Sequence, residues 1–429
     1  PIKQSQLAID GETYRTATWI DGDAADRRLD YPANFVLTRW PKSRVFNYFV
    51  SGQSATYGFA EEHYEPFVTG NDTGEWYERL DDGVGYVVVS RSYADFATAS
   101  NYRTLFDRYG SDRSGDPASG AEHYRALHAS ESGRHAVFDL VPGAVLTGEA
   151  PPNRTISVET PLDLGGETVT YRRTVETTVT GRYAVRVPNP GTYAAPDGEK
   201  AVPEPAVENG TFVARGDGVA RLPLDAGRGS VAFDSTGGNH GFVEGAAWTR
   251  VDGGRALAFD GESFVRVPDA PAPAEATAGD GDGESAGLTV SARFRTNESV
   301  DYRADGRYYP IVARAPESGV NLRNEGYLLA VREGRIVASV GDGAGTTRVI
   351  VGPRVDGGEW HRATLRWDGS RVGLTLDGDL VERKGFELSR RPPDHPLFVG
   401  GPPGYRNFRG VIDDVWVGNR SVAPPEIGE

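Results

Sequence analysis

The carboxylates of the C-terminal half are the side chains whose chemistry is easiest to name. Asp413 and Asp414 are adjacent in a predicted strand and should point to opposite faces, so at most one faces the core. A buried carboxylate needs a cation or hydrogen bonds. A glycosidase needs two carboxylates facing one cleft. Acids able to supply such a pair, none within a recognised motif, are Glu317, Glu325, Glu333 and Asp377.

Other catalytic patterns are missing from the sequence. The chain has no cysteine, which excludes disulfides, thiolate zinc sites, iron–sulfur clusters and cysteine nucleophiles. It has no P-loop, no His-Glu-x-x-His and no Gly-x-Ser-x-Gly. His123 and His128 are five residues apart in one predicted strand and should face opposite sides, which argues against chelation. We therefore predict no catalytic residue, and glycan hydrolysis is kept as a third hypothesis.

Five Asn-x-Ser/Thr sequons favour a surface or secreted, extracytoplasmic location, with chance occurrence as the alternative. Their asparagines are Asn71, Asn153, Asn209, Asn297 and Asn419. The net charge of −15 disfavours nucleic acid as a partner. Only four of the 46 basic residues are lysine, which we expect of a high-salt organism, although a GC-rich genome alone gives the same bias.

The length of 429 residues predicts two to four domains. No stretch approaches eighteen consecutive apolar residues, so nothing in this sequence is expected to span a bilayer as a helix. The chain contains no methionine and begins at Pro1, which indicates a processed or truncated piece. Association with a membrane is therefore expected only through a missing upstream segment.

Three regions differ in their hydrophobic patterns. Residues 1–142 alternate short apolar runs with helical spacing, notably over Tyr57–Thr69 and over Phe96–Tyr109, which predicts an α/β domain. Residues 143–207 show only strand alternation and predict a small antiparallel β-sandwich, followed by a Pro-rich linker from Ala194. Residues 208–429 contain ten or so short strands and predict a two-sheet jelly roll. Pro271–Ala286 is of low complexity and is predicted to be an exposed loop.

Seven segments of the third region, in order, resemble the laminin G-like, concanavalin A-like jelly roll. They are Phe233–Gly241, Ala256–Gly261, Leu288–Phe294, Gly358–His361, Leu374–Gly378, Leu397–Gly401 and Phe408–Val415. The sequence departs from the family at Arg293, where tryptophan is usual. The resemblance covers nearly all of the region. Trp360, at the start of a predicted strand, is expected to anchor the core.

The resemblance implies a ligand set and a partner. Members often hold a structural Ca²⁺ with turn carbonyls and carboxylates, for which the candidates are Asp234, Asp260 and Asp413. Oxygen ligands without cysteine suit Ca²⁺ better than zinc. The alternative is that these aspartates accept hydrogen bonds from their own turns. The resemblance also implies binding of a glycan or a cell-surface protein, and the exposed rings predicted to stack on sugar are Tyr302, Tyr308, Tyr309 and Tyr405.

The first two regions resemble the extracytoplasmic C-terminal part of archaeal oligosaccharyltransferase catalytic subunits. The matching segments are Pro32–Trp40, His123–His128, His135–Ala144, Thr170–Arg172 and Gly181–Pro188. The family's Trp-Trp-Asp-Tyr-Gly motif, which recognises the acceptor sequon, is not conserved in this sequence. Trp40 corresponds to one of its tryptophans, and Asp-Tyr-Gly is absent.

The two resemblances together give a functional hypothesis. The chain is expected to be the extracytoplasmic tail of an oligosaccharyltransferase-related membrane protein from a halophilic archaeon, with a jelly roll that binds glycan or a surface partner. The family's catalytic acids lie in its membrane domain, so this segment should not be catalytic by itself. The alternative is a secreted adhesion or envelope protein with a carbohydrate-binding jelly roll.

Overall fold

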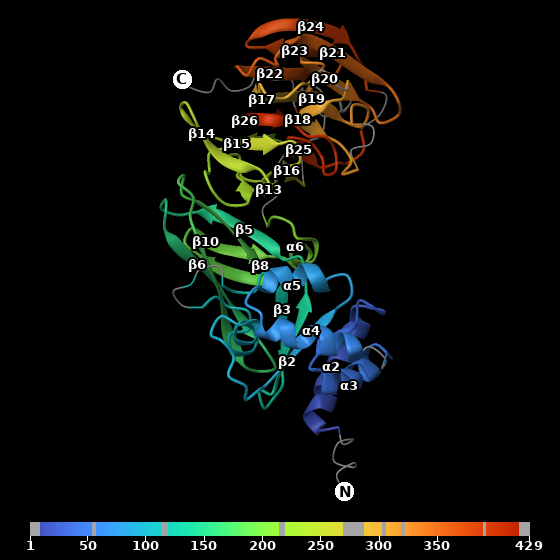
Figure 1. Cartoon of the computed structure of the whole chain (residues 1–429), viewed down its shortest axis with the longest axis vertical. Coiled ribbons are helices and arrows are strands. Elements are labelled where there is room, and N and C mark those ends of the chain that lie inside the picture. The colour runs from blue at the N-terminus through green and yellow to red at the C-terminus, as the bar shows by residue number, and fades with distance from the viewer. Residues whose placement is uncertain are drawn as a thin grey trace, which may run out of the picture. The chain divides into compact units, whose positions relative to one another are not determined.

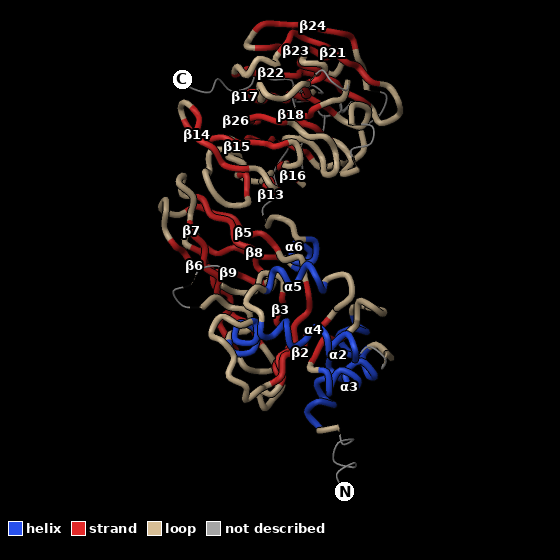
Figure 2. The backbone as a smooth tube through the Cα atoms, in the orientation of Figure 1, coloured by secondary structure: helices blue, strands red, loops and turns tan. Residues whose placement is uncertain are grey.

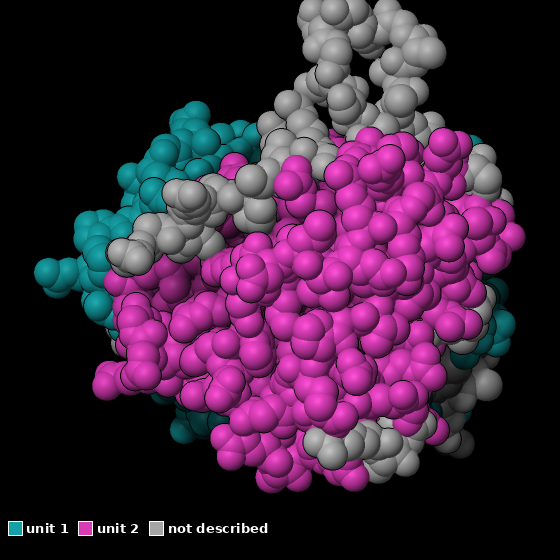
Figure 3. All heavy atoms as spheres, turned by 90° about the horizontal axis from the view of Figure 1, so that it is seen from above, with its two compact units in different colours: residues 1–177, 183–213 teal, residues 178–182, 214–429 magenta. Residues whose placement is uncertain are grey.

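The computed structural model describes residues 9–53, 57–113, 116, 119–213, 219–268, 287–302, 306–318, 322–388 and 392–419. Its contacts divide the chain into two compact units, shown in teal and magenta in Figure 3. Unit 1 comprises residues 1–177 and 183–213, and unit 2 comprises residues 178–182 and 214–429. The predicted loop Pro271–Ala286 lies outside the described residues.

Unit 1 contains the long helices, as Figure 2 shows in blue. They are α2 (Gly11–Asp26), α3 (Trp40–Val50), α4 (Tyr57–Thr69) and α5 (Thr73–Leu80). Helix α2 begins where the side chain of Asp10 accepts a hydrogen bond from the Thr13 amide, which satisfies one of the free amides of the first turn. Asp72 caps α5 in the same way. No helix among the described residues is long and apolar enough to cross a membrane.

The helices cover a four-stranded sheet ordered β1-β2-β4-β3, in which only β1 and β2 are parallel. Its strands are β1 (Val36–Thr38), β2 (Tyr86–Ser90), β3 (Tyr124–Ala129) and β4 (His135–Leu140). Alternate residues face opposite sides. Val36, Tyr86 and Val88 pack with α2 and α3, whereas Leu37 and Val87 face α4 and α5. The predicted α/β layer is therefore present.

The rest of unit 1 is β-structure. Its strands are β5 (Ala144–Glu149), β6 (Thr155–Asp163), β7 (Thr168–Glu176), β8 (Arg182–Val187), β9 (Gly191–Ala195) and β10 (Gly198–Val202). They form a four-stranded sheet, β10-β9-β6-β7, and the pair β5-β8. One hydrophobic core joins this β part to the α/β layer, because Phe67 and Phe138 belong to the same buried cluster as Tyr171 and Tyr193. The predicted boundary at 142/143 thus falls inside a shared core.

Two predictions for unit 1 were wrong. The segment from Ala194 is not a linker, because it forms the β9–β10 hairpin and helix α6 (Glu204–Asn209), which begins with proline in its first turn. The segment Phe96–Tyr109 is helical only near its end, including the short π-helix η1 (Arg103–Asp107). Upstream, Ser92 accepts a hydrogen bond from the Ala94 amide, a local turn that competes with a helix.

Unit 2 is a sandwich of two eight-stranded sheets, which confirms the predicted jelly roll (Figure 1). The first sheet has the order β14-β15-β26-β17-β22-β23-β24, with β11 paired to β26. Its strands are β11 (Val219–Leu222), β14 (Ala247–Val251), β15 (Gly254–Asp260), β17 (Leu288–Thr296), β22 (Trp360–Trp367), β23 (Arg371–Leu376), β24 (Asp379–Gly385) and β26 (Arg409–Gly418).

The second sheet of unit 2 has the order β12-β13-β16-β25-β18-β19-β20-β21. Its strands are β12 (Val231–Ala232), β13 (Gly241–Glu244), β16 (Phe264–Val267), β18 (Tyr309–Arg314), β19 (Tyr327–Arg332), β20 (Arg335–Gly341), β21 (Thr347–Arg354) and β25 (Leu397–Val399). The facing sides of the two sheets enclose one core that includes Phe294, Leu365 and Ile412. Trp367 contributes to this core. Trp360 does not, and it instead lies beneath the guanidinium of Arg293, 4.2 Å from the ring centre.

Candidate binding pocket of the jelly roll

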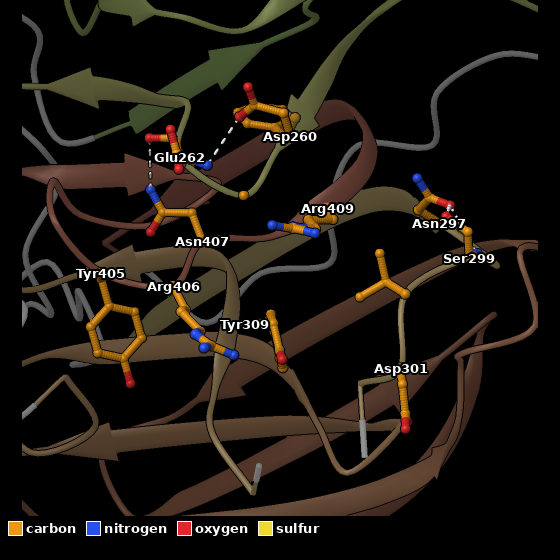
Figure 4. A pocket seen from close by; sticks show the side chains of 13 residues that line it. Asp260, Glu262, Asn297, Ser299, Asp301, Tyr309, Tyr405, Arg406, Asn407 and Arg409 are labelled. Atoms are coloured by element: carbon orange, nitrogen blue, oxygen red, sulfur yellow. Dashed lines mark hydrogen bonds between the residues drawn. The ribbon is translucent and has the colours of Figure 1, made fainter. Parts of the chain in front are cut away.

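A cavity of about 720 Å³ lies where three neighbouring strands of unit 2 end (Figure 4). Its walls come from the end of β15, the segment after β17, the first residue of β18 and the segment before β26. Its lining residues are Phe259, Asp260, Gly261, Glu262, Asn297, Ser299, Val300, Asp301, Tyr309, Tyr405, Arg406, Asn407 and Arg409. Three carboxylates, two guanidinium groups, two amides and two tyrosines therefore surround one space.

Strand register brings these distant residues together. Asp260 at the end of β15 is opposite Arg409 at the start of β26, and Thr296 at the end of β17 is opposite Gly410. Backbone hydrogen bonds then fix the connecting loops. The Asn407 amide donates to the Gly261 carbonyl at 3.0 Å, and the Asn297 amide donates to the Arg409 carbonyl at 3.1 Å. The polar groups of the cavity are thus held on a rigid frame, as a preformed binding site requires.

Asp260 is ionised over the whole physiological range. Its carboxylate accepts hydrogen bonds from the amides of Glu262 and Ser263 at 3.0 and 2.9 Å. These bonds favour the charged form and lower the pKa of Asp260 to about 2. Asn407 is buried and donates to the carbonyls of Glu262 and Ser263, both at 3.4 Å. This wall of the cavity is therefore negatively charged and firmly held.

The four predicted tyrosines have different positions. Tyr405 is half-buried and Tyr309 is buried, and both line the cavity. The prediction of an exposed ring is wrong for Tyr309, which is 6% exposed, and for Tyr302, which is fully buried. Its ring supports Tyr309 edge-on, with centres 4.8 Å apart, and its hydroxyl donates to the Arg409 carbonyl. Tyr308 lies outside the lining and stacks with the guanidinium of Arg332 at 5.0 Å.

The three predicted calcium ligands are not gathered at one place. Among the described residues no group of three or more His, Cys, Asp or Glu side chains is arranged to hold a metal ion. Asp234 is 2% exposed, and its carboxylate is occupied by five donors from its own turn and from Arg221. Asp260 caps its turn. The residues present therefore do not fit a calcium ion shared by this set, and the hydrogen bonds match the alternative of turn capping.

Asp413 lies on the outer surface of the first sheet of unit 2, where Arg293 donates to it at 2.9 Å. Arg362 donates to the neighbouring Asp414 at 2.8 Å. Asp414 has a φ of +47°, and the register with β17 shifts here, so the two carboxylates do not alternate as predicted. Burial, with Asp414 adding repulsion, raises the pKa of Asp413 to about 6 even though Arg293 opposes the shift.

This raised pKa predicts a pH effect on stability. The folded state holds the Asp413 proton more tightly than the unfolded state, whose pKa is near the ordinary 3.8. The contribution of protonated Asp413 to the free energy of unfolding is therefore fully present below about pH 4 and is lost as the pH rises through about 6. We expect the Asp413→Asn variant to lack this decrease in stability between about pH 4 and pH 6. Hydrogen exchange of β17 and β26 peptides between these pH values measures it.

The control for this experiment is Asp252→Asn in the exposed β14–β15 turn, which should keep the wild-type profile. Comparing each variant with the wild type also distinguishes the contribution of Asp413 to the pH dependence of stability from that of His240. Burial lowers the pKa of His240 to about 4, so its contribution runs in the opposite direction and is lost on acidification. Identical slopes for the wild type and Asp413→Asn would show that Asp413 titrates normally.

Of the five asparagines predicted as glycosylation sites, only Asn297 lines this cavity. Asn71, Asn153 and Asn209 are exposed in unit 1, and Asn419 is half-buried in unit 2. The side chain of Asn209 donates to the Pro205 carbonyl at 2.7 Å. Asn297 is exposed and lines the cavity, so a glycan attached to it would stand at the cavity wall. Use of the sequons stays a prediction.

The acids considered for hydrolysis each contact a basic side chain of their own, an arginine for Glu317 and Glu333 and a histidine for Glu325 and Asp377. Glu317 pairs with Arg266, Glu325 with His395, Glu333 with Arg332 and Asp377 with His361. None of them lines the cavity. The cavity's own carboxylates are Asp260, Glu262 and Asp301, of which the sequence singled out only Asp260.

Comparison with known proteins agrees with this fold. Residues 268–428 match the laminin G family model described as the concanavalin A-like lectin/glucanases superfamily. Human sex hormone-binding globulin is 31% identical over 85 residues, which are 19% of this chain and 21% of that protein. The chain thus spans about a fifth of that relative. The C-terminal part of the chain is therefore a laminin G-type, concanavalin A-like jelly roll.

The similar solved structures are remote. The binding domain of Paraclostridial Mosquitocidal Protein 1 shares 18% identity, with 48% of this chain and 50% of that one covered and a TM-score of 0.37. The binding domain of botulinum neurotoxin DC in complex with rat synaptotagmin II shares 14% identity, with 48% of each chain covered and a TM-score of 0.36. The chain spans about half the length of these structures.

Proposed function

We propose that unit 2 is a carbohydrate-binding module and that its ligand occupies the cavity at the ends of β15, β17 and β26. One observation carries the proposal, namely the combination of Tyr405 and Tyr309 with carboxylates, amides and guanidinium groups around one preformed space. A tyrosine ring offers an apolar face and a polar tip. Carboxylate, amide and guanidinium groups supply the acceptors and donors that sugar hydroxyls need. The family description, which names lectins and glucanases, supports the same ligand class.

Charge favours a neutral or zwitterionic glycan over a highly charged one. The lining carries Asp260, Glu262 and Asp301 against Arg406 and Arg409, so positive and negative groups nearly balance. In Figure 4 Asp260 and Glu262 lie on one side of the cavity and Asp301 on the other, with Arg409 between them. Such a site offers hydrogen bonds of both kinds without a strong net field.

The first test is a glycan array probed with the full chain in high salt. The protein should be produced without N-glycosylation, because a glycan on Asn297 would stand at the cavity wall. Parallel arrays with Ca²⁺ and with EDTA test the calcium part of the prediction separately. Binding to a defined glycan supports the proposal. Absence of binding to every glycan would contradict it and would favour a protein partner instead.

Tyr405→Ala should weaken binding to the glycan identified in this way by about tenfold, because the ring face is lost. Tyr308→Ala is the matched control. Both tyrosines pack against the same small buried cluster of Ala313, Leu322 and Leu328, but only Tyr405 lines the cavity. Titration calorimetry with the purified glycan measures both variants. Equal losses in the two variants would indicate that the effect comes from the cluster and that the ligand lies elsewhere.

The oligosaccharyltransferase relationship of unit 1 is a second proposal. It is supported by Trp40, which is 52% exposed, two residues after the end of β1 and at the first position of α3, where that family has its acceptor motif. In this proposal unit 1 lies outside the cell and positions the acceptor of the glycan. The catalytic residues would belong to a membrane domain that is not part of this sequence. The gene sequence upstream of Pro1 tests it: several hydrophobic spans support it, whereas a signal peptide favours a secreted adhesion or envelope protein.

A further inference from the structure

A second cavity, of about 470 Å³, lies within unit 1. Arg39 follows the last residue of β1, and Ser90 and Arg91 lie at the end of β2, so the cavity is at the carboxyl ends of the two parallel strands. The first turns of α2 and α3 supply Thr13 and Lys42. In open α/β sheets this end of parallel strands is where ligands bind.

Four cationic side chains line this cavity, namely Arg39, Lys42, Arg91 and Arg134. Among the described residues that line the cavity, only Asp10 carries a carboxylate, which accepts from Lys42 at 2.7 Å and from Arg134 at 3.5 Å. Arg134 also lies 3.5 Å from Glu12, which is outside the lining. Burial opposes ionisation of Asp10, but the hydrogen bonds from Lys42 and Thr13 hold its pKa below the ordinary value. The lining is thus clearly positive in a chain whose net charge is −15.

Two of the four cations are not neutralised by a carboxylate in the described part of the chain. The guanidinium of Arg91 donates to the carbonyls of Ser132 and Gly133, at 3.2 and 3.0 Å, and pairs with no carboxylate of a described residue. The guanidinium of Arg39 makes no hydrogen bond or ion pair with a described residue. A guanidinium in this state has donors available in the planar fork that suits phosphate oxygens.

Neutral polar groups complete the cavity. His135 is 3% exposed, and the Ser90 hydroxyl lies 2.8 Å from its Nδ1 while the Thr13 hydroxyl lies 3.4 Å from its Nε2. Burial lowers the pKa of His135, which keeps the ring neutral at physiological pH. The Thr13 hydroxyl donates to Asp10 at 2.8 Å, and the Ser90 hydroxyl and the imidazole are hydrogen-bonded to each other. These three groups therefore add no charge to the cavity.

We propose that this cavity binds a phosphate ester. A phosphate carries up to two negative charges and three or four acceptor oxygens, which match several cations better than a single carboxylate does. The cavity is much larger than a phosphate group, so it accommodates part of the attached organic moiety as well. Tyr93 lines it and is 99% exposed, which leaves a ring face on which a sugar ring can stack.

The proposal is tested with the full chain and inorganic phosphate, followed by ³¹P NMR or calorimetry at constant ionic strength. In a separate series of titrations at increasing chloride concentration, binding should weaken, because salt screens the charges. Glucose 1-phosphate should bind at least as tightly as phosphate, and glucose should not bind. Vesicles containing phosphatidic acid distinguish a lipid headgroup from a soluble ester as the natural source.

Arg39→Gln should weaken phosphate binding about tenfold, since a charge-assisted hydrogen bond is lost. Arg39 is exposed and its side chain makes no hydrogen bond or ion pair with a described residue, so this variant should fold normally. The Arg39→Gln, Arg91→Gln double variant should weaken binding further. The control is Arg44→Gln, an exposed arginine of α3 that does not line the cavity, and it should bind like the wild type.

Two results would overturn the proposal. One is the absence of phosphate binding to the wild type at tens of millimolar under low salt. The other is equal affinity in the wild type and the Arg39→Gln variant, which would mean that phosphate associates elsewhere on the surface. Neither result bears on the glycan cavity of unit 2, so failure here is distinguishable from failure of that proposal.

Discussion

Replacing Arg173 by methionine is expected to destabilise unit 1 by about 3–5 kcal/mol, the usual cost of removing one partner of a buried ion pair. Arg173 in β7 is 1% exposed. Its guanidinium lies 3.4 Å from Asp112 and donates to Glu122 at 2.9 Å. Burial alone would raise the pKa of Glu122, and Arg173 holds it below its ordinary value. Without Arg173 the buried carboxylate of Asp112 loses its ion-pair partner, whereas Glu122 has a side chain that is 40% exposed and keeps Arg186 nearby.

The neighbouring residue gives a matched control. Arg172 is exposed and pairs with Glu159 at 2.7 Å on the opposite face of β7. Arg172→Met should cost no more than about 1 kcal/mol, as is typical of a surface ion pair. Urea unfolding measures both variants. The destabilisation caused by Arg173→Met should shrink as the pH falls, because Glu122 is no longer held in its charged form by Arg173 and can then protonate.

The same variant tests the domain organisation. Arg173 lies in the predicted small β domain, whereas Asp112 and Glu122 lie in the predicted α/β domain. Because the ion pairs cross this boundary, β3 and β4 should lose hydrogen-exchange protection together with β6 and β7 in Arg173→Met. Loss of protection confined to β6–β10 would show that the two parts fold independently and would contradict the shared core.

The sequence predicted strands well where one face of each strand is buried. The segment Leu288–Phe294, which carries the family resemblance, lies within β17 (Leu288–Thr296), where Leu288, Val290 and Phe294 recur at even spacing in the core. Helix α2 was missed because its buried positions are small or polar, including Thr13, Thr16 and Ala17, and leave no apolar stripe. β9 and β10 were missed because the prolines around them suggested a linker.

The candidate pocket was only partly predictable for a different reason. Tyr405, Tyr309 and Asp260 were selected from the sequence, and the structure places all three in one cavity lining. Arg409 and Asp301 were not selected, since no local pattern marks them. Their place depends on the pairing of β26 with β15 and β17, which joins segments more than a hundred residues apart. Strand register of this kind cannot be read from single segments.

Gly410→Ala is expected to destabilise unit 2 by about 3 kcal/mol or more, through strain at positive φ and overpacking together. Gly410 lies in β26 between its two neighbouring strands, opposite Phe259 of β15 and Thr296 of β17. Its φ is +151°, and a Cβ would lie 2.2 Å from the Arg295 carbonyl oxygen. That oxygen belongs to a paired strand, so it cannot move aside cheaply.

The effect should extend to ligand binding, because Gly410 directly follows Arg409 of the cavity lining. Gly254→Ala is the control: it lies at the start of β15, and its Cβ would meet no atom within 4 Å. Urea unfolding and glycan affinity are measured for both variants. If Gly410→Ala loses stability but binds glycan with wild-type affinity while still folded, the ligand does not depend on the start of β26, and the site must lie elsewhere on the jelly roll.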